Sequence, residues 1–154
     1  MDIIQAAKNV SQIPVFDLDP ASCAYANELH LGRLSNVFYT EEMDGLSRPW
    51  MGHVWLSPPV GYDSSSGIPK QALWFMHAEK KFKSGEMQSC HVLLKLDFQS
   101  QWLLRAFHYP HCQITVKLQF TLPPSSLSNH HGSDDSYMLV YLYFVFPKKK
   151  LIIG

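Results

Sequence analysis

Polar side chains that could hold a nucleoside follow three of the apolar segments of this chain. They are Asp17 and Asp19 after the first segment, Asp44 after the second and Ser57 after the third. A carboxylate can accept hydrogen bonds from both hydroxyls of a ribose, and open α/β sheets bind ligands beyond the carboxyl ends of their strands. Each residue alone also has a simpler interpretation, because Asp before Pro often caps a helix and Ser-Pro-Pro often forms a rigid loop.

The elements that must position these residues alternate between strands and helices. Short apolar runs bounded by turn residues predict the strands. Pro69 opens an amphipathic helix that Gly85 ends, and Asp19 is expected to cap a helix that begins at Pro20. The predicted strands cover residues 13–18, 37–40, 53–56, 91–96, 114–120 and 137–146, and the predicted helices cover 21–30, 69–84 and 98–108.

This alternation predicts a single α/β domain over residues 1–154 with a mostly parallel sheet. The last two strands have no clear helix between them, which predicts an antiparallel edge. The chain has 154 residues, of which 46% are hydrophobic, enough for one core. A two-domain enzyme or a mostly disordered chain is therefore not expected.

The amino-acid composition limits the kinds of partner and cellular location that are expected for this chain. The chain has 13 Lys and Arg residues and 13 Asp and Glu residues, so its net charge is zero. Contact with DNA would therefore need a local basic patch on the surface. Three cysteines and the lack of a secretion leader predict an intracellular protein without disulfides. The apolar segment 137–146 is shorter than the roughly 20 residues of a membrane helix. His108, His111 and Cys112 lack a metal-ligand spacing, even with the histidine pair at 130–131, so no metal is expected.

The order and spacing of four segments resemble the phage-type DNA adenine methyltransferase (Dam) family. The segments are FDLDPAS at 16–22, AN at 26–27, FYTEEMDGL at 38–46 and GHVWLSPPVG at 52–61. The recognisable core spans about residues 15–142 and includes weaker matches at 91–95, 109–112 and 129–133. The resemblance implies a Rossmann-like fold of S-adenosylmethionine-dependent methyltransferases.

The activity that this resemblance implies is methyl transfer from S-adenosylmethionine to the exocyclic N6 amino group of adenine in DNA. That nitrogen is a poor nucleophile because its lone pair is delocalised into the ring, so two acceptors must take hydrogen bonds from its N–H groups. The implied acceptors are Ser57 Oγ and the carbonyl of Pro58, in a loop that Pro59 helps to fix, while Val60 stands where the motif has an aromatic base wall. The base must first leave the duplex stack.

The resemblance also assigns the cofactor to four side chains. They are Asp17, Asp19, Asn27 and Asp44. Asp19 is expected on the ribose or methionine side of S-adenosylmethionine, and Asp44 on the side of its adenine.

Contacts with DNA are expected from aromatic and basic side chains near the motif. Tyr62 is a second candidate for the base wall, and Trp50 is a candidate for base stacking in the turn before the motif strand. Lys80 and Lys83 could contact phosphates. The alternative interpretations are a core position for Trp50 and a solvated helix face for the lysines.

The chain departs from the family pattern in ways that keep other hypotheses open. Val60 replaces an aromatic residue, and a lost base stack costs roughly 1–3 kcal/mol. Ser57 stands where Asn is usual, and no Gly-rich loop occurs, so the segment before the first motif is expected to be abbreviated or missing. The second hypothesis is a catalytically degenerate methyltransferase fold that binds nucleic acid or protein. A third is a methyltransferase for adenine in RNA.

Overall fold

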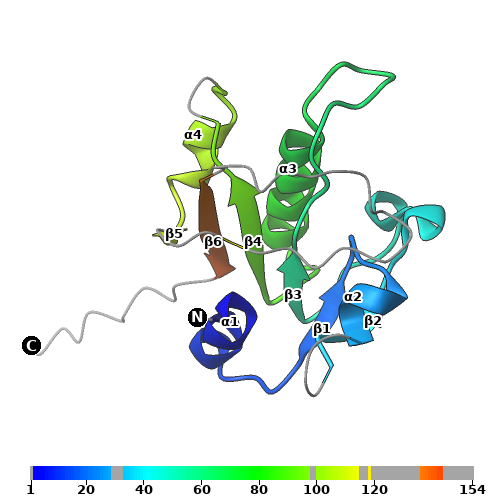
Figure 1. Ribbon diagram of the computed structural model, residues 1–154, viewed down its shortest axis with the longest axis vertical. Coiled ribbons are helices and arrows are strands. Elements are labelled where there is room, and N and C mark those ends of the chain that lie inside the picture. Colours follow the sequence, from blue (N-terminus) through cyan, green and yellow to red (C-terminus); the bar gives the residue numbers. More distant parts are fainter. Residues whose placement is uncertain (1, 29–32, 98–99, 115–117, 119–135, 144–154) are drawn as a thin grey trace, which may run out of the picture.

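The computed structural model of the chain describes residues 2–28, 33–97, 100–114, 118 and 136–143. Helices and strands alternate through most of this part (Figure 1). The elements are α1 (Ile3–Ser11), β1 (Phe16–Asp19), α2 (Ala24–Glu28), β2 (Ser35–Phe38), the 3-10 turns η1 (Glu41–Met43) and η2 (Gly45–Ser47), β3 (His53–Leu56), α3 (Lys70–Lys83), β4 (Ser89–Lys95), α4 (Leu103–Ala106), β5 (His111–Ile114) and β6 (Tyr137–Tyr143).

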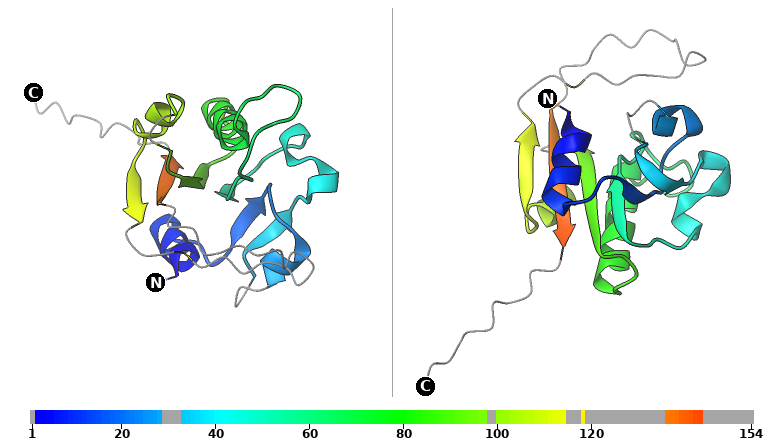
Figure 2. Two further views of the ribbon diagram at one scale, coloured as in Figure 1. Left: turned by 45° about the horizontal axis from the view of Figure 1, so that its top comes forward. Right: turned by 90° about the horizontal axis from the view of Figure 1, so that it is seen from below.

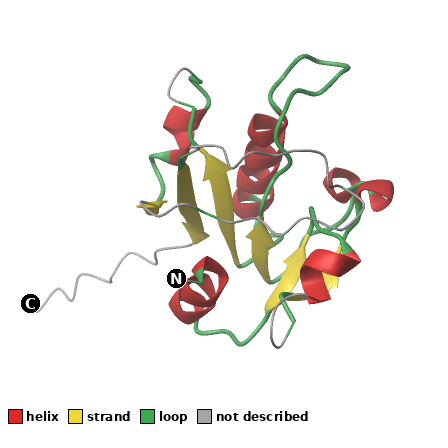
Figure 3. Ribbon diagram, viewed as in Figure 1, coloured by secondary structure: helices red, strands yellow, loops and turns green. Residues whose placement is uncertain are grey.

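The strands of the described residues form one six-stranded sheet in the order β2-β1-β3-β4-β6-β5 (Figure 3). The strands β1 to β4 run parallel, and β6 runs antiparallel to both of its neighbours. The predicted α/β class with a mostly parallel sheet is therefore confirmed. The last two strands, β5 and β6, pair antiparallel at one edge of the sheet as predicted, with β5 as the outermost strand.

One face of the sheet is covered by α3 and α4. Ala72, Phe75, Ala78 and Phe82 form a buried stripe on α3, because positions three or four residues apart share a helix face. Phe75 and Phe82 belong to the same core cluster as Leu56 and Val92 of the sheet. This packing fixes α3 against β3 and β4.

The opposite face of the sheet is covered by α1, so the fold has three layers (Figure 2). Ala7 of α1 is buried in a cluster with Phe16, Trp55 and Leu93 of the strands. Because both faces are covered, the central strands are apolar on both sides, as is usual in parallel sheets.

Several predicted elements have the expected bounds. β3 covers the predicted strand 53–56, and the helix that follows Pro69 ends before Gly85, which has the positive φ of 77° typical of a residue after a helix. β6 begins at Tyr137 as predicted. The predicted strand residues 144–146 lie outside the described residues.

Other boundaries were predicted wrongly. Asp19 ends β1 instead of capping a helix at Pro20, and α2 begins only at Ala24. The predicted helix 98–108 is reduced to α4, because the preceding hydrogen bonds join residues three apart, as in turns. β5 lies at His111–Ile114, and most of the predicted strand 114–120 lies outside the described residues.

In the part of the chain that the structure describes, no helix is both long and apolar enough to cross a bilayer.

Candidate functional site

The strand order creates a topological switch point between β1 and β3. The chain passes from β1 outward to β2 on one side and then to β3 on the other, so the connections that leave β1 and β3 diverge. Such a divergence opens a crevice at the carboxyl ends of the two strands, where α/β proteins bind ligands. Asp19 ends β1, and Ser57 directly follows β3. The fold therefore brings these two predicted residues to one edge of the sheet.

Asp19 is a buried carboxyl group at this edge, with only 3% of its surface exposed. Its Oδ1 accepts a hydrogen bond of 3.1 Å from the backbone N–H of Ala21, and the hydroxyl of Ser22 assists. No cation forms an ion pair with it among the described residues. Burial raises the pKa of Asp19 to about 7, against an ordinary 3.8. Carboxyl groups with a strongly raised pKa are found more often at functional sites than elsewhere in proteins.

The loop after β2 folds onto the end of β1. A Cβ atom on Gly45 would lie 2.0 Å from the carbonyl oxygen of Pro20, so only glycine permits this contact. Asp44 directly precedes Gly45 and is exposed, in the left-handed region with φ of 52°. Since Pro20 directly follows Asp19, the contact brings Asp44 to the same edge of the sheet as Asp19.

The other two predicted cofactor residues lie at the opposite edge. The Oδ2 of Asp17 accepts a hydrogen bond of 2.7 Å from the backbone N–H of His53, the first residue of β3. The Oδ1 of Asn27 accepts hydrogen bonds from the N–H and the hydroxyl of Ser35, the first residue of β2. Both side chains hold the amino ends of strands in place, and the structure does not bring them to the edge where Asp19 and Asp44 lie.

The segment that follows β3 leaves the sheet through its two prolines. Ser57 is half-buried and Pro58 is buried, whereas Pro59 and Val60 are exposed. The side chain of Val60 is 58% exposed and lies at the rim of a cavity.

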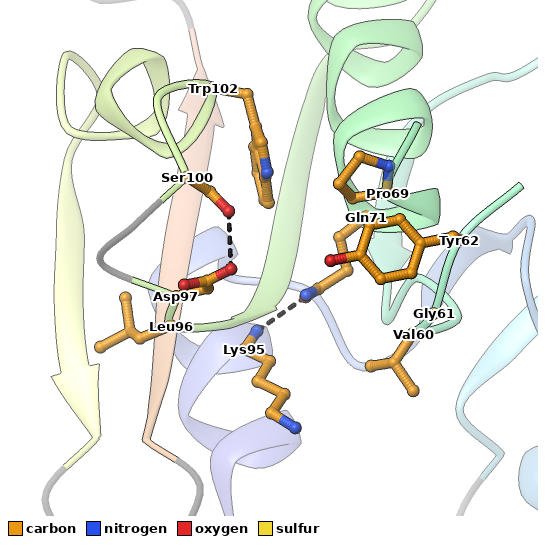
Figure 4. Close-up of a pocket in the computed structure, with 10 residues that line it drawn as sticks. All are labelled: Val60, Gly61, Tyr62, Pro69, Gln71, Lys95, Leu96, Asp97, Ser100 and Trp102. Atoms are coloured by element: carbon orange, nitrogen blue, oxygen red, sulfur yellow. Dashed lines mark hydrogen bonds between the residues drawn. The ribbon is translucent and has the colours of Figure 1, made fainter. Parts of the chain in front are cut away.

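This cavity of about 330 Å³ lies between the segment after β3, the start of α3 and the segment after β4 (Figure 4). Tyr62 and Trp102 contribute aromatic rings from different sides of it. The volume falls within the range of small-molecule sites. Its lining consists of Val60, Gly61, Tyr62, Pro69, Gln71, Lys95, Leu96, Asp97, Ser100 and Trp102.

The polar groups of the cavity are held by hydrogen bonds. The backbone N–H of Lys95 donates to Oε1 of Gln71 over 2.8 Å, and the hydroxyl of Ser100 donates to Oδ2 of Asp97 over 2.7 Å. The indole Nε1 of Trp102 is buried, and no hydrogen-bond partner is found for it within the described residues.

The loop that carries Tyr62 is also well ordered by hydrogen bonds. Tyr62 pairs with Pro69 in a bridge, and the backbone N–H of Lys70 donates to the carbonyl of Gly61 over 2.9 Å. Asp63 accepts from the hydroxyls of Ser65 and Ser66, and these bonds lower its pKa to about 2. The side chain of Tyr62, which is 70% exposed, is therefore presented from a structured loop.

The predicted DNA contacts have different outcomes. Trp50 is only 1% exposed, its Nε1 donates to the carbonyl of Gly45, and its ring stacks on Trp74. Its prediction as a base-stacking residue was wrong, and the core interpretation holds. Lys80 and Lys83 lie in the last turn of α3, near the start of β4 and away from the cavity. The structure does not bring them to the candidate site.

Sequence reasoning missed Gln71, Asp97 and Ser100 as residues of the cavity. A signal for Asp97 was present, since it follows a predicted strand as Asp19 and Ser57 do. Gln71 carries no such signal, because it lies in a helix whose inner face is apolar.

The remaining reactive side chains do not form a second site. Within the described ranges, no group of three or more His, Cys, Asp or Glu residues could hold a metal ion. Cys90 is buried in β4, and burial raises the pKa of its thiol well above the ordinary value. The histidines at 130–131 and the segment 129–133 lie outside the described residues.

Comparison with known proteins found no match among protein-family models, curated proteins or solved structures.

Proposed function

We propose that this chain is an S-adenosylmethionine-dependent methyltransferase that acts on the N6 amino group of adenine in DNA. The observation that carries the proposal is the arrangement at one edge of the sheet. Asp19 ends β1 and Ser57 follows the neighbouring strand β3 at the switch point, and the lining of a cavity with two aromatic rings begins at Val60, three residues after Ser57. This arrangement offers one place for a nucleoside cofactor and an adjoining place for a planar base.

The residues at the switch point fit a cationic cofactor. A buried carboxyl group without a cation costs stability, and a positively charged ligand would offset that cost by favouring the ionised form. Asp19 would lie toward the charged methionine part, and Asp44 toward the nucleoside part. S-adenosylmethionine, when bound, supplies an electrophilic methyl group.

Ser57 and Pro58 would act on the amino group that receives the methyl. Ser57 Oγ and the Pro58 carbonyl can each accept a hydrogen bond from the N6 amino group, which draws its lone pair out of the ring. The burial of Pro58 and the two consecutive prolines restrict this carbonyl to a narrow range of positions, so it needs little reorganisation.

The cavity would receive the base after its extrusion from the duplex. Extrusion costs a few kcal/mol, and stacking on aromatic side chains offsets about 1–3 kcal/mol per base. Tyr62 and Trp102 supply aromatic rings at the cavity, and this compensates for Val60 at the position of the family's aromatic residue.

The proposal is tested by calorimetric titration of the protein with S-adenosylmethionine and with its demethylated product. We expect saturable binding that Asp19→Asn and Asp44→Asn weaken. Glu41→Gln is the matched control, since it removes an exposed charge from the same loop as Asp44. Folded protein that binds neither compound would contradict the proposal.

A second candidate function is a binding module without turnover, and the exposure of Val60 favours it. A valine that is 58% exposed at the rim of the cavity offers little surface for stacking. Val60→Tyr separates the two functions, because added stacking should raise methyl transfer to DNA about tenfold or more in an active enzyme. Methylation of mixed-sequence DNA with labelled cofactor measures this. If both proteins bind DNA but transfer no methyl, the binding module is the better description.

A further inference from the structure

Gln71 has an amide whose orientation is determined by its neighbour. A backbone N–H can only donate, so the side-chain atom that faces the N–H of Lys95 at 2.8 Å must be the oxygen Oε1. The NH₂ group of Gln71 therefore lies on the other branch of the amide. Within the part of the chain that is described, this NH₂ group donates no hydrogen bond.

The surroundings of Gln71 resemble a slot for a flat polar ring. Gln71 lies in the second position of α3 and lines the cavity together with Tyr62, Pro69 and Trp102 (Figure 4). A ring stacked in this slot would present its edge to the Gln71 amide. The Gln71 nitrogen is not one of the buried polar atoms that lack a partner among the described residues, so its NH₂ group is open to the cavity and can donate to a ligand that enters it.

We propose that Gln71 is a specificity-determining residue, which donates a hydrogen bond from its NH₂ group to a ring nitrogen of the extruded adenine. This inference rests on the proposed function, since it takes the cavity as the site of the target base. The unprotonated ring nitrogens of adenine are acceptors and match the donor. A carboxylate at the same position would meet them as a second acceptor and repel them.

The test combines a change in the protein with a change of single atoms in the base. Gln71→Glu retains an oxygen for the N–H of Lys95 and replaces the NH₂ group by a second oxygen. The probes are short single-stranded DNA oligonucleotides whose flanks contain only C, G and T, with a central adenine, an abasic site, or the 1-deaza, 3-deaza or 7-deaza analogue of adenine. Affinities are measured by fluorescence anisotropy without cofactor.

A matched control accounts for the added negative charge. Gln101→Glu makes the same substitution at an exposed position between Ser100 and Trp102 that does not line the cavity. Its effect on binding of the abasic oligonucleotide should equal that of Gln71→Glu. The difference between the two variants with adenine then reports the hydrogen bond rather than general repulsion of DNA.

We expect one deaza analogue to bind the unchanged protein about three- to tenfold more weakly than adenine, which corresponds to one lost hydrogen bond. In Gln71→Glu the same analogue should bind as well as adenine does. Additive losses, or equal affinity of the unchanged protein for adenine and the abasic site, would overturn the inference. The outcome is independent of catalysis. If the deaza analogue loses affinity for the unchanged protein but not for Gln71→Glu, and no methyl is transferred, the role of Gln71 stands and the proposed enzymatic activity is rejected. If methyl is transferred but the two proteins show the same loss of affinity for the analogue, the role of Gln71 is rejected.

Discussion

Asp19 is the residue whose environment is least explained by folding alone. It is buried and receives one backbone and one hydroxyl hydrogen bond, and burial outweighs both of them in its effect on the pKa. Native proteins retain such groups where the cost is compensated by function. The position of Asp19 at the buried end of β1 thus explains both its cost in stability and its proposed contact with the cofactor.

The first prediction concerns Asp19→Asn. The pKa of Asp19 in the folded protein, about 7, exceeds its ordinary value of 3.8, so the folded state holds the proton more tightly. The stabilising contribution of the protonated group is complete below about pH 4 and is lost as the pH rises to about 7. Asparagine retains the acceptor for the N–H of Ala21 and avoids the buried charge. We expect equal stability of the two proteins at pH 4 and a gain for the variant on the order of 4 kcal/mol above pH 7.

Urea unfolding of both proteins from pH 4 to 8 measures this effect. Asp44→Asn is the control, since this exposed group should give curves parallel to those of the unchanged protein. The measured quantity is the difference in unfolding free energy between Asp19→Asn and the unchanged protein. If this difference is the same at pH 8 as at pH 4, Asp19 is ionised at little cost in the folded state.

Contacts between neighbouring loops and helices shape the site at the scale of elements. The loop that carries Asp44 depends on Gly45, because a side chain there would collide with the backbone of Pro20. The wall that carries Trp102 depends on Glu79 of α3, whose carboxylate receives hydrogen bonds from Arg105 and from the hydroxyl of Tyr109. The proposed cofactor side, with Asp44, and the proposed base side, with Trp102, are therefore held by separate contacts.

Gly45→Ala is predicted to loosen the cofactor side. The new methyl group would overlap a backbone carbonyl that cannot rotate away, and overpacking of this kind costs about 1–3 kcal/mol. We expect a lower melting temperature and weaker binding of S-adenosylmethionine. Glu41→Ala, at an exposed position of the same loop, should change neither quantity. Normal stability of Gly45→Ala would show that the loop lies farther from β1.

Glu79→Ala is predicted to loosen the base side. Removal of the carboxylate leaves the hydroxyl of Tyr109 without its 2.7 Å partner and releases Arg105, for a loss of about 1–3 kcal/mol. Burial, and after it the same bond to Glu79, raise the pKa of Tyr109 to about 12, so absorbance titration should find a lower tyrosine pKa in the variant. Lys83→Ala, whose Nζ lies 3.7 Å from Glu79 and is largely exposed, should cost under about 0.5 kcal/mol. An unchanged tyrosine titration would contradict the contact.

At the scale of the whole molecule, β6 joins the parallel strands to β5, because it pairs with β4 on one side and with β5 on the other. The pair β4–β6 is the junction between the parallel and the antiparallel part of the sheet. His91 of β4 lies at this junction, 2% exposed, stacked on Tyr141 of β6 with 4.2 Å between ring centroids, and its Nδ1 has no partner in the described part. Burial and the nearby His53 lower the pKa of His91 to about 4. The junction therefore requires a neutral histidine.

Acid is predicted to weaken this junction. The folded pKa of about 4 lies below the ordinary 6.5, so the unfolded chain binds the proton more tightly, and stability falls as the pH decreases from about 6.5 to 4. The loss is on the order of 3 kcal/mol. Asp19 acts in the opposite direction over the same range, so the effect is measured in the Asp19→Asn background. His91→Phe retains an aromatic ring but cannot bind the proton. Adding it to Asp19→Asn should reduce the fall in the free energy of urea unfolding between about pH 6.5 and 4. A fall as steep as in Asp19→Asn alone would contradict the prediction.

The sequence by itself determined the elements that depend on local chemistry. The apolar run 53–56 followed by two prolines defines β3 and places Ser57 and Pro58 at its end, since proline cannot continue a strand ladder. Pro69 and Gly85 likewise bracket α3. These features depend on residues near one another in the chain, which is why pattern and turn residues predicted them.

The tertiary structure alone decided which side chains share the site. Asp17 and Asp19 are two residues apart and look equivalent in the sequence, yet one holds the start of β3 and the other ends β1 at the crevice. Trp50 and Trp102 are equally plausible stacking residues by type, and only packing places one in the core and the other at the cavity. Strand order and register bring distant segments together through long-range burial and hydrogen bonding, and no local pattern of residues encodes those partners.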